Sequence, residues 1–302
     1  MKRIIIAICM LTLFTVKAQQ EPQYTQYMYN MSIVNPAYAG FEDVLSIGFL
    51  GRKQWVGVKG APETYTAFIH GKVDEDLGLG FSLINDKMGP VNETFANIDF
   101  SYRINLTESI KLGLGIKGGV IFQNIGLVDL NQADDRDVVF SSNKNKGYPA
   151  MGVGMLAYNE RFYLSISVPN FIRTLHFKQD YEKEISSAEE IHTYIGAGYV
   201  VDVHKKLKVK PSFLCKYAIG TPVAFDTSLN MLWNEKVEFG VSYRLDDALS
   251  FLTNFKITHT LRIGYAYDHT LSNINDYSSG SHEIMVLFDF FSNKKKRYVR
   301  FY

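Results

Sequence analysis

The side chains that could support hydrolysis lie near the end of the chain, and they are Asp268, His269, Ser281 and His282. A catalytic set of this kind works only when the base reaches the nucleophile by a hydrogen bond and the acid orients the base. We interpret the four residues as rim and loop residues, because no G-x-S-x-G, H-E-x-x-H, Walker or paired-cysteine motif occurs in the sequence. The sequence therefore predicts that the protein is not an enzyme and has no cofactor or metal site.

The other nucleophilic and metal-binding side chains are isolated. Seven histidines are scattered singly along 302 residues, and the two cysteines, Cys9 and Cys215, lie far apart. Cys9 falls within a predicted signal peptide, so Cys215 stays alone and is interpreted as a small apolar strand residue. Without that peptide the chain has 29 basic and 31 acidic residues. This balance argues against a nucleic-acid partner.

Residues 1–18 follow the pattern of a secretory signal peptide. Lys2 and Arg3 form a positive head, and residues 4–16 are mostly apolar. Val16-Lys17-Ala18 then places small residues at the two positions that a signal peptidase recognises. The apolar run is too short to cross about 30 Å of hydrocarbon as an anchor. We expect cleavage near Ala18 and export from the cytoplasm.

The elements that position the remaining polar groups have a period of two residues. In the segment 96–105, one face carries Ala96, Ile98, Phe100, Tyr102 and Ile104. The opposite face carries Asn97, Asp99, Ser101, Arg103 and Asn105. Successive side chains of a strand point to opposite sides, so this segment predicts a strand with one apolar and one polar face. A soluble sandwich with its apolar face inward would also alternate in this way.

Similar segments follow one another along nearly the whole chain without helical spacers. They begin near Val44, Thr64, Leu77, Val91, Ile110, Tyr148, Phe162, Ile191, Leu207, Val223, Lys236, Leu249, Thr260 and His282. Many have about ten residues, as membrane-spanning strands require, whereas soluble strands usually have about 5–6. Aromatic residues make up 14% of the chain, as is typical of barrels with aromatic girdles. The sequence predicts an all-β fold, a transmembrane antiparallel β-barrel of about 14 strands with a short N-terminal leader segment.

The lengths of the connections predict how the barrel is oriented. With both termini in the periplasm, every connection after an even-numbered strand is short. The long connections, roughly 124–147 and 170–190, follow odd-numbered strands and are expected to face outside. Charged side chains then line the lumen, and apolar side chains face the outer-membrane lipid.

Two segments differ from the barrel at residues 44–292. Residues 19–43 form a polar and aromatic leader that Pro36 and Gly40 interrupt, and it is either disordered or packed in the lumen or at the periplasmic mouth. Residues 293–302 contain five basic side chains and form a periplasmic tail. This tail is either solvated or a docking peptide.

Several motifs resemble those of the PorP/SprF family. The resemblance covers the whole mature chain, and it is specific at the two ends and generic between them. Its opening and closing motifs are Tyr24–Asn30, Val34–Gly40, Arg52–Trp55, Ala61–Thr64, Gly264–Asp268, Leu271-Ser272 and Ser279–Ile284. The resemblance implies an outer-membrane component of the type IX secretion system, without enzymatic activity or cofactor. Other components of that system and a secreted adhesin-like or gliding protein are its implied partners.

Eight of the recurrent family residues are the candidate partner-binding residues, and they map to Tyr27, Asn35, Pro36, Tyr38, Gly40, Arg52, Gln54 and Trp55. Gly280, His282 and Glu283 near the other end also recur in the family. Asn35-Pro36 is expected to fix a turn at the barrel entrance, because proline restricts the preceding residue to extended conformations. Arg52 and Gln54 have the same strand parity, and we expect them to meet the leader inside the lumen.

Two functions from different classes fit these observations. The first is a secretion partner that assists the secretion or surface retention of one protein. The second is a porin-like channel for small solutes, for which a charged lumen is equally suitable. We prefer the first because of the opening and closing motifs. The outer loop at 134–137 is a candidate for choosing the partner.

Overall fold

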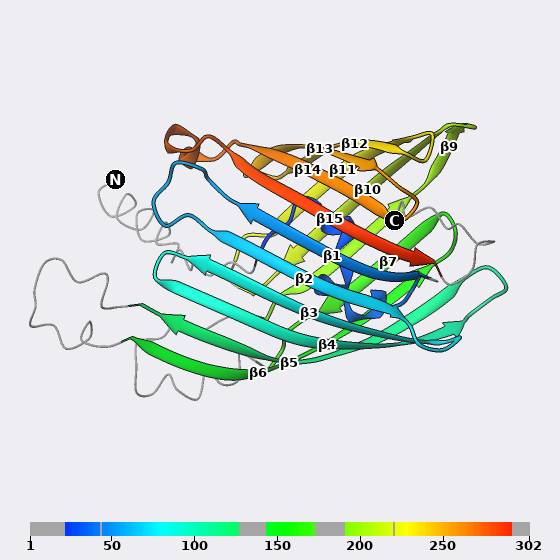
Figure 1. The fold of residues 1–302 in the computed structure, drawn as a ribbon, viewed down its shortest axis with the longest axis horizontal. Coiled ribbons are helices and arrows are strands. Elements are labelled where there is room, and N and C mark those ends of the chain that lie inside the picture. Colours follow the sequence, from blue (N-terminus) through cyan, green and yellow to red (C-terminus); the bar gives the residue numbers. More distant parts are fainter. Residues whose placement is uncertain (1–21, 43, 127–142, 173–190, 220, 292–302) are drawn as a thin grey trace, which may run out of the picture.

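The computed structural model describes residues 22–42, 44–126, 143–172, 191–219 and 221–291. The predicted signal peptide, the loop at 134–137 and the basic tail lie outside these residues. Within them the chain is almost entirely β-structure surrounding a short internal segment (Figure 1). No helix of the described residues is long and apolar enough to cross a membrane.

The wall is one antiparallel sheet that closes on itself. Its strands are β1 (Val44–Lys53), β2 (Glu63–Lys72), β3 (Leu77–Met88), β4 (Val91–Asn105), β5 (Lys111–Ile125), β6 (Lys144–Tyr158), β7 (Phe162–Val168), β8 (Thr193–Tyr199), β9 (Val201–His204), β10 (Leu207–Tyr217), β11 (Ala224–Trp233), β12 (Val237–Arg244), β13 (Ala248–Lys256), β14 (Leu261–Thr270) and β15 (Ser281–Phe291). Apart from β8 and β9, each strand pairs with its neighbour in sequence, and β15 pairs with β1. β8 and β9 both pair with β10 and make one crossing interrupted at Val200. The result is the predicted closed barrel of 14 strands.

The two faces of the wall have the predicted polarity. Large apolar side chains such as Phe49, Ile98 and Ile116 are exposed on the outside, where lipid would cover them. Asp99, Lys117 and the other polar residues of alternate positions are buried inside the barrel. This arrangement suits a membrane barrel, because hydrocarbon solvates the outer face and the lumen shelters the charges.

The connections are distributed as the sequence predicts. Those following even-numbered crossings span residues 73–76, 106–110, 159–161, 205–206, 234–236 and 257–260. The longest connections, 126–143 and 169–192, follow odd-numbered crossings at the other end. Two connections at that end, 89–90 and 245–247, are nevertheless short. Short turns face the periplasm in barrels of this kind, so we assign the end with the long connections to the cell surface.

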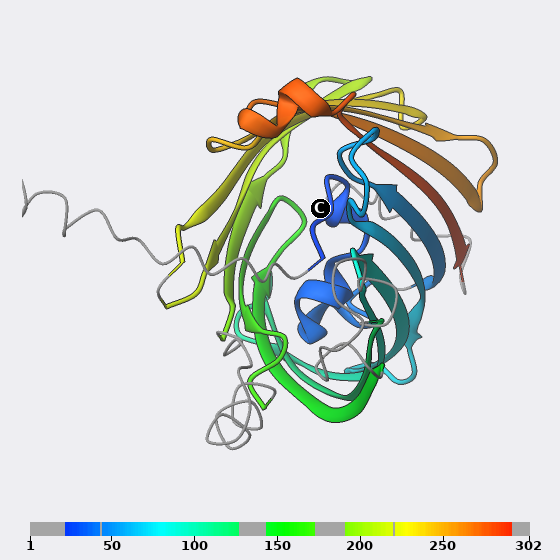
Figure 2. The ribbon, with the colours of Figure 1, turned by 90° about the vertical axis from the view of Figure 1, so that its left-hand side faces the viewer.

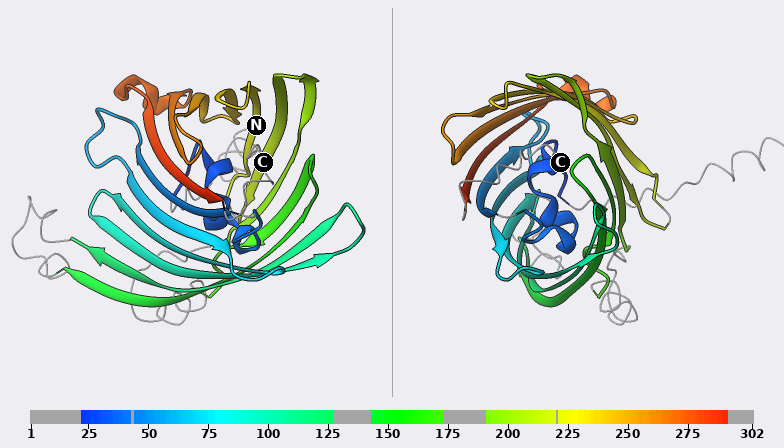
Figure 3. Two further views of the ribbon diagram at one scale, coloured as in Figure 1. Left: turned by 45° about the vertical axis from the view of Figure 1, so that its right-hand side comes forward. Right: turned by 90° about the vertical axis from the view of Figure 1, so that its right-hand side faces the viewer.

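The leader lies inside the barrel. Its turns are η1 (Tyr27–Tyr29), α2 (Met31–Val34) and η2 (Pro36–Tyr38), and every residue from Tyr24 to Gly40 is buried. Figure 2 shows these turns enclosed by the ring of strands, and the two panels of Figure 3 show the same enclosure from an oblique direction and from the other end. The sequence leaves open whether the leader is disordered or packed in the lumen or at the periplasmic mouth. The described part of the leader is packed in the lumen.

Candidate functional site

A buried charged cluster holds the start of the leader. Glu283 of β15 accepts hydrogen bonds from the backbone N–H groups of Thr25 and Gln26, each at 2.8 Å. The Thr25 hydroxyl donates to Asp268 of β14 at 2.7 Å. Arg52 of β1 bridges the two carboxylates, at 2.6 Å from Asp268 and 3.2 Å from Glu283. We call Thr25, Arg52, Asp268 and Glu283 the outer clamp, because it lies in the half of the barrel assigned to the cell surface.

The middle of the leader meets a second charged group. Tyr29 donates its hydroxyl proton to Glu238 of β12. The guanidinium of Arg262 lies over the Tyr29 ring, 5.3 Å from its centre, and 3.6 Å from the Glu238 carboxylate. Asn230 donates to the other oxygen of Glu238 at 2.6 Å. A tyrosine with an apolar ring and one polar end suits this position, because both parts find partners.

On the opposite wall, Lys117 of β5 binds the leader backbone. Its ammonium donates to the carbonyl oxygens of Ser32 and Ile33, at 3.2 and 3.1 Å. Its charge is balanced by Asp99 of β4, at 3.1 Å. Lysine is rarely buried unless it is paired, and here one side chain neutralises a carboxylate and satisfies two carbonyls at the end of α2.

Asn35 and Pro36 fix the turn that follows. The Asn35 amide donates to the carbonyl of Met155 at 2.9 Å and to the hydroxyl of Ser165 at 2.8 Å. Its side-chain oxygen accepts from the backbone of Ala37 at 2.9 Å. Asn35 is extended, at φ −140° and ψ 114°, as a residue before proline must be. The predicted turn is present, and it lies within the lumen against β6 and β7 rather than at an entrance.

Glycines of the wall make room for this turn. A Cβ added at Gly115 would overlap the backbone of Pro36 and Ala37, and one at Gly154 would overlap Asn35. Inward-facing glycine therefore allows close approach of the leader backbone, one of the roles expected of glycine within a strand.

The end of the leader is fixed at the periplasmic side. Arg103 donates to the carbonyl oxygens of Gly40 and Phe41, at 2.8 and 3.0 Å. Gly40 has φ +64°, and a Cβ there would come within 2.7 Å of the Gly78 Cα. Because both the left-handed backbone and the lack of space exclude a side chain, glycine is required at this position.

The structure places most of the predicted site residues in one region. All of them except the half-buried Trp55 are buried, and Asn35, Pro36, Gly40 and Arg52 make the contacts described above. Burial raises the pKa of Tyr27 to about 12. Tyr38 packs edge-on against Phe41 and Tyr163.

Gln54 and Trp55 lie just beyond β1, which ends at Lys53, rather than within it as the sequence suggested. The Gln54 backbone donates to Pro62, and that of Trp55 donates to the hydroxyl of Ser281. These two residues therefore belong to the surface-side connections, where the opening motif meets the closing motif.

The four side chains considered for hydrolysis do not converge. Asp268 points into the lumen and belongs to the outer clamp. His282 is on the opposite face of the wall, where it shares a hydrogen bond of 2.7 Å with the Tyr265 hydroxyl. Ser281 accepts from the Trp55 backbone. The acid and this histidine are thus separated by the wall itself.

The alternation of side chains predicts a lumen position for other residues of this site but does not predict their contacts with the leader. They include Asp99, Lys117, Glu238 and Arg262. One signal did exist: Met285 and Leu287 are apolar at inward positions of β15, and the structure buries both completely. Apolar side chains on a lumen face indicate that something packs against them.

Fold and site together define a class, an outer-membrane β-barrel whose lumen is occupied by its own N-terminal leader. A family profile described as "Type IX secretion system membrane protein PorP/SprF" matches residues 16–288. The chain belongs to this family and is an outer-membrane component of the type IX secretion system. No curated protein matches the sequence.

Several solved protein structures are similar to this chain at low sequence identity. The toluene transporter TbuX of Ralstonia pickettii is 9% identical over 86% of this chain and 93% of its own, with a TM-score of 0.51. A FadL homologue of Pseudomonas aeruginosa is 11% identical over 90% and 95%, with a TM-score of 0.48. Omp33 of Acinetobacter baumannii is 9% identical over 82% and 98%, with a TM-score of 0.47. These similarities concern the fold alone.

Proposed function

We propose that this protein assists the secretion or surface retention of one partner protein, an adhesin-like or gliding protein exported by the type IX system, and that it does so without catalysis. The observation that carries the proposal is the leader inside the lumen. Because the leader fills the interior of the barrel, solutes have no open pore through the described residues. The two ends of the barrel remain accessible to protein partners.

The contacts of the leader support this proposal. The outer cavity, in the half assigned to the cell surface, is lined by residues such as Tyr24 and Asn97. The inner cavity, at the periplasmic end, has a volume of about 550 Å³ and is lined by residues such as Glu42 and Arg103. The two cavities have no lining residue in common, and the leader lies between them. The inner cavity opens where other components of the secretion system would bind.

A porin-like channel for small solutes is the alternative. The charged lumen favours it only if those charges face water. Lys117, Glu238 and Arg262 instead contact the leader, so these three charges are not available to line a water-filled pore. The predicted partner-binding residues of the leader then act indirectly, by holding it in place.

The experiment that tests the proposal is a quantitative comparison of surface and secreted proteins between wild-type cells and a deletion of this gene. We expect one or a few large proteins to leave the surface and to return when the gene is restored. An unchanged protein profile, together with slower uptake of a small solute, would contradict the proposal and favour the channel.

A further inference from the structure

The lumen has an apolar patch that borders the leader on its surface side. Ile84, Phe95, Ile121 and Ala150 lie side by side at inward positions of β3, β4, β5 and β6. Ile121 and Ala150 are buried and pack together with Phe95 against them. Toward the periplasmic side these strands turn mostly glycine and polar side chains inward, with exceptions such as Leu156 of β6, which is completely buried in the leader's core. Unlike Leu156, the patch also lines a cavity.

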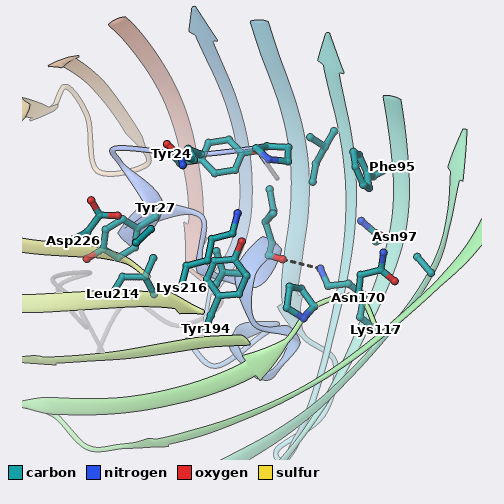
Figure 4. A pocket seen from close by; sticks show the side chains of 18 of the residues that line it. Tyr24, Tyr27, Phe95, Asn97, Lys117, Asn170, Tyr194, Leu214, Lys216 and Asp226 are labelled. Carbon is teal, nitrogen blue, oxygen red and sulfur yellow. Dashed lines mark hydrogen bonds between the residues drawn. The ribbon is translucent and has the colours of Figure 1, made fainter. Parts of the chain in front are cut away.

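The patch forms one wall of the outer cavity. Tyr194 of β8 and Leu214 of β10 lie across from it, and Tyr24 of the leader borders it (Figure 4). Ile33 and Val34 of the leader form its floor, and the backbone of this part is held by Lys117 and Ser167. The cavity therefore ends at the leader and is a pocket rather than a passage.

The size of the cavity limits what it can hold. Its volume is about 100 Å³, somewhat less than the roughly 150 Å³ of an apolar cavity that binds benzene. It fits one branched aliphatic or single-ring aromatic side chain, and it is too small for a folded element or a lipid chain.

A buried polar atom at the edge of the cavity lacks a hydrogen-bond partner. Asn170 lines the cavity, and its side-chain oxygen is buried without a hydrogen bond. An amide oxygen in this state needs a donor, because burial removes the water that would otherwise supply one. A peptide N–H next to an inserted side chain is a donor of the required kind.

We propose that the outer cavity is a socket that takes one aliphatic or aromatic side chain of the secreted partner, with the neighbouring peptide N–H donated to Asn170. This inference rests on the proposed function and specifies where the partner binds. A segment of a protein is a better candidate than a solute passing through the barrel, because the leader closes the cavity toward the periplasm. The cavity also lies in the half of the barrel assigned to the cell surface, where the partner would be.

The main test fills the socket. Ala150→Phe places a ring in the cavity, whereas Ala96→Phe adds the same ring to the lipid-facing side of β4, opposite Leu83 and Val120. We expect Ala150→Phe to lower the surface amount of the partner at least tenfold and Ala96→Phe to leave it unchanged. Heat-modifiable migration in gels confirms that each barrel is folded. Asn170→Leu keeps the shape of the side chain and should cause a several-fold loss.

A second measurement does not depend on the folding of the filled variant. A p-benzoylphenylalanine side chain at position 146, an inward position of β6 between the patch and the cell surface, leaves the cavity empty and should crosslink in living cells to the protein that the gene deletion removes from the surface. The same probe at position 96 should not. If the deletion removes a surface protein but it persists in Ala150→Phe, or if position 146 fails to capture it, the socket is wrong and the proposed function stands. If the deletion removes nothing, the proposed function itself fails.

Discussion

Arg52 shows at the residue scale how the barrel and the leader depend on each other. It lies between Asp268 and Glu283, and all three side chains are buried. Without its charge the two carboxylates would remain in a closed space with only hydroxyl and amide donors. Removing one partner of a buried ion pair destabilises the fold far more than replacing the whole pair by apolar residues. The reason is that a single removal leaves a buried charge without a partner.

Replacing Arg52 by Met should therefore destabilise the folded barrel by about 3–5 kcal/mol. The free energy of unfolding in urea, measured in lipid vesicles, checks this value. Lys53→Met is the matched control, because Lys53 pairs with Glu63 on the surface and both are partly exposed. An exposed pair contributes little, so its unfolding midpoint should not move. Equal effects of the two substitutions would argue against the outer clamp.

Glycines of β5 allow a second comparison within one strand. Gly115→Ala places a methyl group against the backbone of Pro36 and Ala37, whereas a Cβ at Gly118 would meet nothing within 4 Å. Gly115→Ala should displace the turn η2 and raise the rate at which a protease cuts the leader by at least tenfold, as followed by mass spectrometry. In Gly118→Ala the protease should cut the leader as slowly as in the wild type. Slow cleavage in both variants would mean that the leader tolerates the added methyl group at position 115.

At the scale of elements, the wall and the leader are held by different interactions. The strands form a continuous ladder of backbone hydrogen bonds that closes through β1 and β15. The leader has only short turns and depends on side chains from the wall. A closed ladder satisfies its own backbone groups in lipid, so we expect the wall to persist without the leader.

Deleting residues 23–41 should thus leave a folded barrel with an open lumen. Planar-bilayer recordings should show steady conductance for the deletion and almost none for the full chain. The lumen charges freed by the deletion would line the pore. Full-length protein that conducts as strongly as the deletion would show that the leader does not seal the lumen, and the channel alternative would regain support.

At the scale of the whole molecule, the leader has a direction. Tyr24 hydrogen-bonds Thr66 near the surface-side end of β2 at 2.9 Å, whereas Gly40 and Phe41 bind Arg103 at the periplasmic side. The chain thus runs from the surface side of the lumen to its periplasmic side before β1 begins. This direction follows from the assignment of the short turns to the periplasm.

Cysteine labelling in intact cells tests this orientation. In a Cys215→Ala background, a membrane-impermeant maleimide should label Lys59→Cys in the connection after β1 and should not label Glu108→Cys in the short turn after β4. Gln23→Cys, at the outer cavity, should label like Lys59→Cys. Labelling of Glu108→Cys instead would mean that the barrel has the opposite orientation in the membrane and that the outer cavity lies on the periplasmic side.

The alternation of side chains made the barrel predictable from the sequence. Segments such as 96–105 alternate because lipid selects one face and the lumen the other, and this selection acts on each strand separately. The predicted strand starts consequently lie close to those observed. The largest difference is at β6, predicted near Tyr148 and observed from Lys144. β4, β5 and β6 have 15 residues each, more than the about 9–11 that span a bilayer, so their polar ends lack the alternation imposed by lipid.

The strand order, the polarity of the two faces and, through the motifs, the family can be predicted from the amino-acid sequence alone. The position of the leader and the contacts that hold it depend on the folded barrel. Tyr29 meets Glu238, and Ser32 meets Lys117, across 209 and 85 residues of chain. No local pattern encodes such pairs, because they depend on the register and curvature of strands that come together only when the barrel closes.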